Sequence, residues 1–211
     1  MIKSIIYTLT YIIFFIVVAI VLFINLAPQF GSNPSSEQKV FYDSFPNYSK
    51  GGFENFEPTP MMTGEISTWD FFKEDSSRKP TSAILPKSIN FDSFAKNNSD
   101  YRLAWLGHSA FLINVMGKII LLDPMLGSHA APIPLPNLKR FNEVLPIKLD
   151  SVDRIDFVVI SHDHYDHLDY STIKLLKDKV SKFLAPHGIG NHLKKWGVKS
   201  NQIVELNWNE S

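Results

Sequence analysis

The chain has no cysteine among its 211 residues, and this absence excludes several kinds of protein. Disulfide frameworks, thiolate zinc fingers, iron–sulfur clusters and cysteine nucleophiles all need the missing side chain. An excess of positive charge is missing too, because 21 basic residues balance 21 acidic ones. Since nucleic-acid-binding domains carry a basic footprint, we expect no nucleic-acid partner.

Charge is also absent from the N-terminal segment. No charged residue occurs between Lys3 and Glu37, and residues 5–26 are almost continuously apolar. About 22 residues at about 1.5 Å each give roughly 33 Å of helix, enough to cross a hydrocarbon core of about 30 Å. We therefore predict a transmembrane anchor at residues 1–27. A cleavable signal peptide is the alternative, but it has a shorter apolar stretch and a small-residue cleavage site, whereas here Ala27 is followed by Pro28.

The orientation of the anchor rests on Lys3 and the N-terminal amine, the positive charges nearest the N-terminal end. The positive-inside rule then places the N-terminus in the cytoplasm and the domain outside it. We expect a single-pass membrane protein with the lipid bilayer as a partner. The sequence leaves the oligomeric state open.

The remainder divides into a leader and a domain. Residues 28–100 are rich in proline and aromatic residues but show no sustained period, so we predict an extended leader that packs its aromatic rings onto the domain. Residues 101–211 form the predicted domain. Its pattern predicts strands at 101–106, 110–115, 119–123, 156–161, 182–185 and 202–206, and helices at 170–179 and 190–196. This order is typical of an α/β or α+β fold.

The segment directly after strand 156–161 carries the chemical signal. It reads Ser161-His162-Asp163-His164-Tyr165-Asp166-His167-Leu168-Asp169. In an extended chain His162 and His164 point to the same side, because the side-chain period of a strand is two residues. Their imidazoles can therefore share one metal ion. Asp166 and His167 follow after a turn, where they can converge on a second ion.

Imidazole and carboxylate ligands without sulfur suit Zn²⁺ foremost, with iron or manganese as alternatives. The competing interpretation is a polar loop whose histidines are merely solvated. Three histidines and three aspartates within residues 162–169 argue against that interpretation. A serine hydrolase is not indicated, since the chain has no Gly-x-Ser-x-Gly motif.

The pattern His162-x-His164-x-Asp166-His167 resembles the metal signature of the metallo-β-lactamase-fold hydrolases. Within that superfamily the chain is similar to the branch that contains N-acyl-phosphatidylethanolamine-hydrolysing phospholipase D. The similarity runs from about Phe30 to the C-terminus. The segments that carry it are Trp105-Leu106-Gly107-His108-Ser109, Leu121-Leu122-Asp123-Pro124, His164 to Asp169, Glu205-Leu206-Asn207-Trp208, Ser44-Phe45-Pro46-Asn47-Tyr48 and Gly52-Phe53-Glu54-Asn55.

This resemblance implies an αββα sandwich that holds two zinc ions. By motif position His162 and His164 bind the first ion, and Asp166 and His167 bind the second. A hydroxide activated by the metals would attack phosphorus or a carbonyl carbon, and Asp166 would also orient it. Asp123 and Asp169 are candidates for outer acceptors that orient the ligands, although either could instead cap a turn or a helix.

The resemblance also predicts ligands that this chain lacks. The family completes its site with a histidine, a bridging aspartate and a last histidine in the second half of the sandwich. After His167 the sequence offers only His187, in a loop that is not a ligand in the family, and His192, which we expect on a helix surface. We therefore expect the chain to cover the N-terminal half of the fold, with one sheet face left bare.

Two further histidines precede the motif. We interpret His108, in a Gly-His-Ser turn, as a structural turn residue, with a place at the site entrance as the alternative. His129 is expected to face solvent or substrate.

The sequence thus predicts a membrane-anchored zinc hydrolase. The resemblance implies a phosphodiesterase of the phospholipase D type, acting on lipids like N-acyl phosphatidylethanolamine. The alternatives are a catalytically incomplete fragment of such an enzyme, and a metallohydrolase of lactone or thioester substrates.

Overall fold

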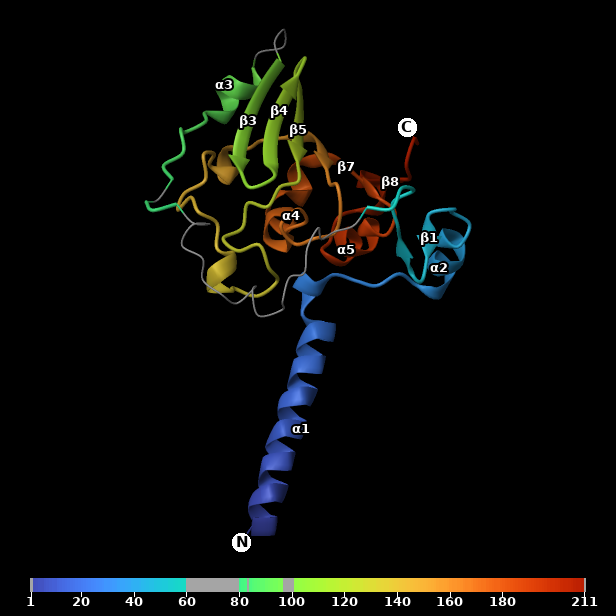
Figure 1. The fold of residues 1–211 in the computed structure, drawn as a ribbon. Helices are drawn as coiled ribbons and strands as arrows, with labels where there is room; N and C mark the ends of the chain where they lie inside the picture. The colour runs from blue at the N-terminus through green and yellow to red at the C-terminus, as the bar shows by residue number, and fades with distance from the viewer. Residues whose placement is uncertain (1, 60–79, 83, 97–100, 211) are drawn as a thin grey trace.

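The computed structural model describes residues 2–59, 80–82, 84–96 and 101–210. Its centre is a six-stranded sheet in the order β3-β4-β5-β6-β7-β8 (Figure 1). The strands are β3 (Tyr101–Gly107), β4 (Ala110–Val115), β5 (Lys118–Leu122), β6 (Ile155–Val159), β7 (Val180–Pro186) and β8 (Ile203–Leu206). The pairs from β3 to β5 are antiparallel and those from β5 to β8 are parallel. This mixed sheet with its crossover helices confirms the α/β or α+β class.

The helices of the domain are short. They are α3 (Phe91–Ala95), α4 (Tyr170–Leu176) and α5 (Ile189–Lys195), with 3₁₀ turns at Pro136–Leu138, Leu149–Ser151, Lys177–Lys179 and Ser200–Gln202. The hairpin between β4 and β5 turns at Met116 and Gly117, whose φ angles are 51° and 82°. Two consecutive positive φ angles match the twist of a two-residue hairpin, so the chain reverses tightly between the two strands.

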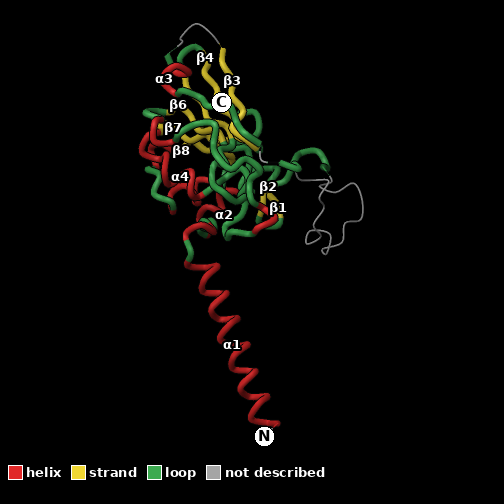
Figure 2. The backbone as a smooth tube through the Cα atoms, turned by 90° about the vertical axis from the view of Figure 1, so that its left-hand side faces the viewer, coloured by secondary structure: helices red, strands yellow, loops and turns green. Residues whose placement is uncertain are grey.

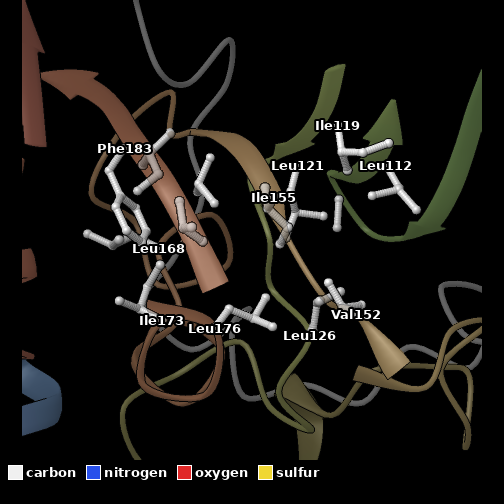
Figure 3. Close-up of a cluster of buried hydrophobic side chains, with 14 of the residues drawn as sticks. Leu112, Ile119, Leu121, Leu126, Val152, Ile155, Leu168, Ile173, Leu176 and Phe183 are labelled. Atoms are coloured by element: carbon white, nitrogen blue, oxygen red, sulfur yellow. The ribbon is translucent and has the colours of Figure 1, made fainter. Parts of the chain in front are cut away.

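One row of side chains crosses the whole sheet on its buried face. The pairing register places in this row Ala104, Leu112, Leu121, Val158, Phe183 and Ile203. Side chains of α4 and α5, including Ile173 and Leu193, belong to the same core cluster. Figure 3 shows Ile173 and Leu176 of α4 among the buried side chains. Each fully buried side chain of this kind contributes roughly 1.5–3 kcal/mol to the free energy of unfolding.

The opposite face of the sheet is apolar as well. Its register row contains Trp105, Phe111, Leu122, Val159, Leu184 and Val204. At the β3 edge Trp105 is 58% exposed and Leu103 is 65% exposed. A sheet with two apolar faces is built to be covered on both sides, which is the pattern of a sandwich layer.

Helix α1 (Ile2–Leu26) projects away from the domain (Figure 2). None of its residues is buried. By length and composition it is able to cross a membrane, although a signal sequence near an N-terminus passes the same test.

The leader after α1 packs onto the domain through aromatic rings. It contains a 3₁₀ turn (Pro28–Phe30), helix α2 (Ser36–Tyr42) and a small hairpin of β1 (Tyr48–Ser49) and β2 (Gly52–Phe53). Its rings surround His187, which follows β7, and the ring centroid of Phe45 lies 4.8 Å from that of His187. His187 is therefore part of the contact between leader and domain.

A second contact fixes the chain just after α1. The Ser32 backbone N–H donates to His192 Nδ1 at 2.9 Å, and Trp196 Nε1 donates to the Pro28 carbonyl at 2.7 Å. Burial, followed by the charge of Lys195, lowers the pKa of His192 in spite of the nearby charge of Asp163. The expectation that His192 lies on an open helix surface was wrong, because the leader covers this side of α5.

Candidate metal centre

The motif follows β6 at the edge where the parallel strands end. The Asp123 backbone N–H donates to the Val159 carbonyl at 2.9 Å, so the end of β5 is held beside the end of β6. Asp123 has a φ of 41°, in the left-handed region that aspartate tolerates better than most residues. The chain turns there, and the Asp123 carboxylate faces the start of the motif.

Asp123 binds the motif with both carboxylate oxygens. Its Oδ1 accepts the Ser161 backbone N–H at 2.7 Å, and its Oδ2 accepts the Ser161 hydroxyl at 2.7 Å. His167 Nδ1 lies 3.0 Å from the same Oδ2. An ionised carboxylate can only accept, so His167 carries its proton on Nδ1 and leaves the Nε2 lone pair free for a metal ion.

The loop then reverses direction and gathers the imidazoles. The backbone N–H groups of His167 and Leu168 both donate to the His164 carbonyl, at 2.9 and 2.8 Å. The ring centroid of His162 lies 4.6 Å from that of His164 and 4.0 Å from that of His167. The three rings therefore lie together at the edge of the sheet, as the motif spacing predicts.

Asp166 meets His167 and a histidine from a different part of the chain. His108 Nε2 lies 2.8 Å from Asp166 Oδ2, and His167 Nε2 lies 3.5 Å from the same oxygen. Ligand atoms of His108, Asp166 and His167 all fall within 4.8 Å of one another. Two imidazoles and a carboxylate at this spacing match the nitrogen and oxygen donors that Zn²⁺ accepts, so the residues present fit a metal ion.

Local electrostatics favour the forms that bind metal. Burial alone would raise the pKa of Asp166, but hydrogen bonds, that from His108 first, and the charges of His167 and His108 hold it below its usual value. Burial, followed by the charges of His167 and His164, lowers the pKa of His162. An ionised carboxylate and a neutral imidazole are both the metal-binding forms.

For His108 the structure supports the alternative interpretation, a place at the site entrance, over that of a merely structural turn residue. Its ring reaches Asp166. Gly107 and His108 have φ angles of 116° and 46°, and Trp105 Nε1 donates to the His108 carbonyl at 2.8 Å. The signal available was the Gly-His-Ser turn at the end of β3, at the same edge as the motif.

The predicted outer acceptors differ in their contacts. Asp123 touches His167, as described above. Asp169 is the N-cap of α4, and its Oδ2 accepts the Gly127 backbone N–H at 2.8 Å. Among the described residues its hydrogen bonds go to Gly127, Ser171 and Thr172, and none goes to a motif histidine. Its role in orienting ligands stays a prediction, as do the roles of His162, His164, Asp166, His167 and Asp123.

A largely apolar cavity of about 780 Å³ adjoins the centre at His108. It lies between the end of β3, residues 84–89 of the leader and the loop of residues 125–146. Its lining includes Ile84, Ile89, Trp105, His108, Met125, Leu138, Arg140, Phe141 and Leu145. Cavities of this size and character hold small-molecule ligands.

Comparisons with known proteins identify the class. Residues 118–211 match the Beta-lactamase superfamily domain. The chain is 35% identical over 187 residues to an uncharacterized protein of Mycobacterium tuberculosis, which covers 86% of this chain and 49% of the relative. It is 30% identical over 109 residues to a metal-dependent hydrolase of Saccharolobus solfataricus, covering 50% of this chain and 42% of the relative. Residues 118–211 thus match a beta-lactamase superfamily domain, and the relatives of the chain include metal-dependent hydrolases, which agrees with the resemblance that the motif carries.

A more particular similarity lies within this class. The N-acyl-phosphatidylethanolamine-hydrolyzing phospholipase D 1 of Caenorhabditis elegans is 34% identical over 142 residues, covering 64% of this chain and 39% of the relative. The chain spans about half the length, or less, of these curated relatives. Among solved structures, the isothiocyanate hydrolase from Delia radicum gut bacteria has a TM-score of 0.41 at 22% identity, covering 50% of this chain and 41% of that one. A diiron beta-hydroxylase from Streptomyces venezuelae has a TM-score of 0.38 at 27% identity, covering 51% of this chain and 20% of that one.

Proposed function

We propose that the chain is a membrane-anchored, zinc-dependent phosphodiesterase of the phospholipase D type, acting on lipids like N-acyl phosphatidylethanolamine. The observation that carries the proposal is the convergence of the motif side chains at the strand ends, where Asp123 leaves His167 Nε2 free for a metal. The name of the nematode relative supports the substrate class. The apolar cavity beside His108 offers room for part of a lipid.

Each side chain has a proposed role. His162 and His164 hold one zinc ion, and Asp166 and His167 hold the second. Bound zinc supplies Lewis acidity and a water whose pKa is lowered towards neutrality. Asp166 would also orient the attacking water, through the carboxylate oxygen that faces His108 and His167. His108 keeps this carboxylate ionised and in place.

The anchor has a proposed role as well. We infer that α1 crosses the membrane once, with the N-terminus in the cytoplasm and the domain on the other side. Lys3 at the N-terminal end supports this orientation. The carboxyl ends of β3 and β5 point towards the end of the domain from which α1 leaves (Figure 1), which supports a centre that faces the membrane.

Hydrolysis by the full chain in lipid vesicles tests the proposal. Zinc-loaded protein should release phosphatidic acid from N-acyl phosphatidylethanolamine. His162→Ala should lower the rate by more than the about 10- to 100-fold that loss of an outer partner of a ligand costs, because it removes a ligand itself. His129→Ala is a matched control, since its ring contacts the Ser128 hydroxyl and no motif residue. If the protein cleaves a lactone or a thioester but not the phosphodiester, the proposed phospholipid substrate is wrong and the protein is a metallohydrolase of that other class. Zinc binding without any turnover would indicate a catalytically incomplete site.

A further inference from the structure

Residues 131–144, which we call the proline loop, present apolar side chains to solvent. Ile133, Leu135 and Leu138 are each 39% exposed, and Phe141 is 51% exposed. Residues 131–138 contain no charged side chain, and Lys139 and Arg140 follow at once. A cluster of exposed apolar residues next to basic ones is unusual on a surface that faces only water.

The loop is held rigidly from behind. The Ala130 backbone N–H donates to the Leu138 carbonyl at 2.9 Å, and the Arg140 N–H donates to the Ser128 carbonyl at 3.1 Å. The Arg140 side chain donates to the Leu126 carbonyl at 2.8 Å. Prolines at positions 132, 134 and 136 restrict the backbone of the tip. Collapse of the apolar side chains onto the domain would therefore break the hydrogen bonds of Ala130 and Arg140, so the loop keeps these side chains exposed.

The loop lies at the end of the domain from which α1 leaves. In Figure 1 the turn Pro136–Leu138, coloured gold, lies near the level of the short blue turn that follows α1. The chain after α1 is fixed to α5 by the bonds from Trp196 to Pro28 and from Ser32 to His192. If α1 spans a bilayer, this end of the domain is the end nearest the lipid surface.

We propose that the proline loop is a second membrane contact, inserting its apolar tip into the bilayer that α1 crosses. Ile133, Leu135 and Leu138 enter the interface, while Lys139 meets the lipid phosphates. Leu138 and Phe141 also line the cavity beside His108. The contact therefore sets the cavity against the bilayer, so that a lipid acyl chain can enter it directly. This inference rests on the proposed function only in that α1 spans the membrane.

The absence of cysteine allows a direct test by site-specific labelling. Leu135→Cys in the full chain is labelled with an environment-sensitive fluorophore and reconstituted, one copy per nanodisc, in phosphatidylcholine with phosphatidylglycerol. Met116→Cys is the control, because Met116 is an equally apolar side chain, 67% exposed, in the hairpin turn at the other end of β4 and β5. Nitroxide lipids should quench the Leu135 label several-fold more strongly than the Met116 label. Aqueous iodide should quench in the opposite order.

A second variant tests the apolar contact itself. Leu138→Asp in the labelled Leu135→Cys background should restore quenching by iodide, because a carboxylate resists entry into the interface. Equal iodide quenching at positions 135 and 116 would overturn the proposal. A label at 135 that is shielded from iodide but not quenched by lipid would overturn it too, since protein would then cover the loop. Extraction of the chain from the membrane by alkaline carbonate would instead refute the proposal that α1 spans the bilayer. A chain that does not hydrolyse the lipid would still give the same quenching results, so failure of the proposed activity can be told apart from failure of the membrane contact.

Discussion

Replacement of Asp123 by asparagine tests how the metal centre is prepared. Asparagine has the same size and also tolerates the left-handed backbone at this position, where φ is 41°. Its amide has one acceptor and one donor side, whereas the Asp123 carboxylate accepts from Ser161 twice and from His167 once. If the amide oxygen keeps the Ser161 N–H, the amide NH₂ faces His167 Nδ1. That contact favours the tautomer with its proton on Nε2, the nitrogen that the metal needs.

The expected magnitude follows from this change of tautomer. Loss of the carboxylate partner of a ligating histidine lowers metal affinity by about 10- to 100-fold. This loss corresponds to about 1.4–2.7 kcal/mol of binding free energy. Because Asp123 is 6% exposed, the mispaired amide should also lower the free energy of unfolding by about 1–3 kcal/mol. The variant should therefore fold but bind zinc weakly.

Competition against a chromophoric chelator measures the zinc affinity, with circular dichroism to check the fold. Asp156→Asn is the matched control, since Asp156 accepts from the Ile119 N–H at 2.9 Å and from Lys118, and contacts no histidine. It loses the same charge without touching the motif. Wild-type zinc affinity in folded Asp123→Asn would refute the tautomer mechanism. An equal loss in Asp156→Asn would show that the effect comes from net charge or from the fold.

Three further predictions concern the leader and α4. Gly31→Ala should lower the free energy of local unfolding of the leader by about 2–3 kcal/mol, because φ at this position is 70° and the new Cβ would lie 1.8 Å from His192 Nδ1. Amide exchange at residues 31–35 should become faster as a result. His192 has a lowered pKa in the folded chain, so its contribution to stability is complete above its ordinary pKa of 6.5 and is lost as the pH falls below that value. Protection of the Ser32 amide against hydrogen exchange should therefore fall as the pH is lowered below 6.5. Constant protection would contradict this prediction. Asp169→Ala should lower the free energy of unfolding by about 1–3 kcal/mol, because α4 loses its N-cap and the Gly127 N–H loses its acceptor. Unchanged zinc affinity in this variant would count against a role of Asp169 in orienting the metal ligands.

Much of the sheet could be predicted because its signals are local. The alternation of Leu112 and Asn114 with Phe111 and Ile113 is a period of two, and the structure turns it into two faces of β4. The predicted strands all occur, with ends displaced by up to two residues. Strand ends depend on pairing partners that lie elsewhere in the chain, such as Ile155, which pairs with Val180, so the local pattern could not place them.

The candidate site could be predicted only where its residues are neighbours in the chain. His162 and His164 share a side because of strand geometry, and the turn that follows brings His167 close. His108 lies 58 residues from Asp166, and no period relates the two positions. Their contact depends on the Gly107 turn at the end of β3, whose register against β4 shifts there. Only the assembled sheet shows that this turn and the motif share an edge.

Helix α5 explains why the candidate centre and helix α1 lie at the same end of the domain (Figure 1). It follows β7, the neighbour of β6 in the sheet, so its position is fixed by the strand that pairs with the one preceding the motif. Its outer side carries His192, which holds Ser32, and Trp196 beyond its end holds Pro28. Its inner side buries Leu193 in the core. The chain that directly follows α1 is therefore fixed to the same packing that places the motif histidines. If α1 spans a membrane as proposed, a disruption at Gly31 should alter how the centre is presented to that membrane without altering its metal affinity.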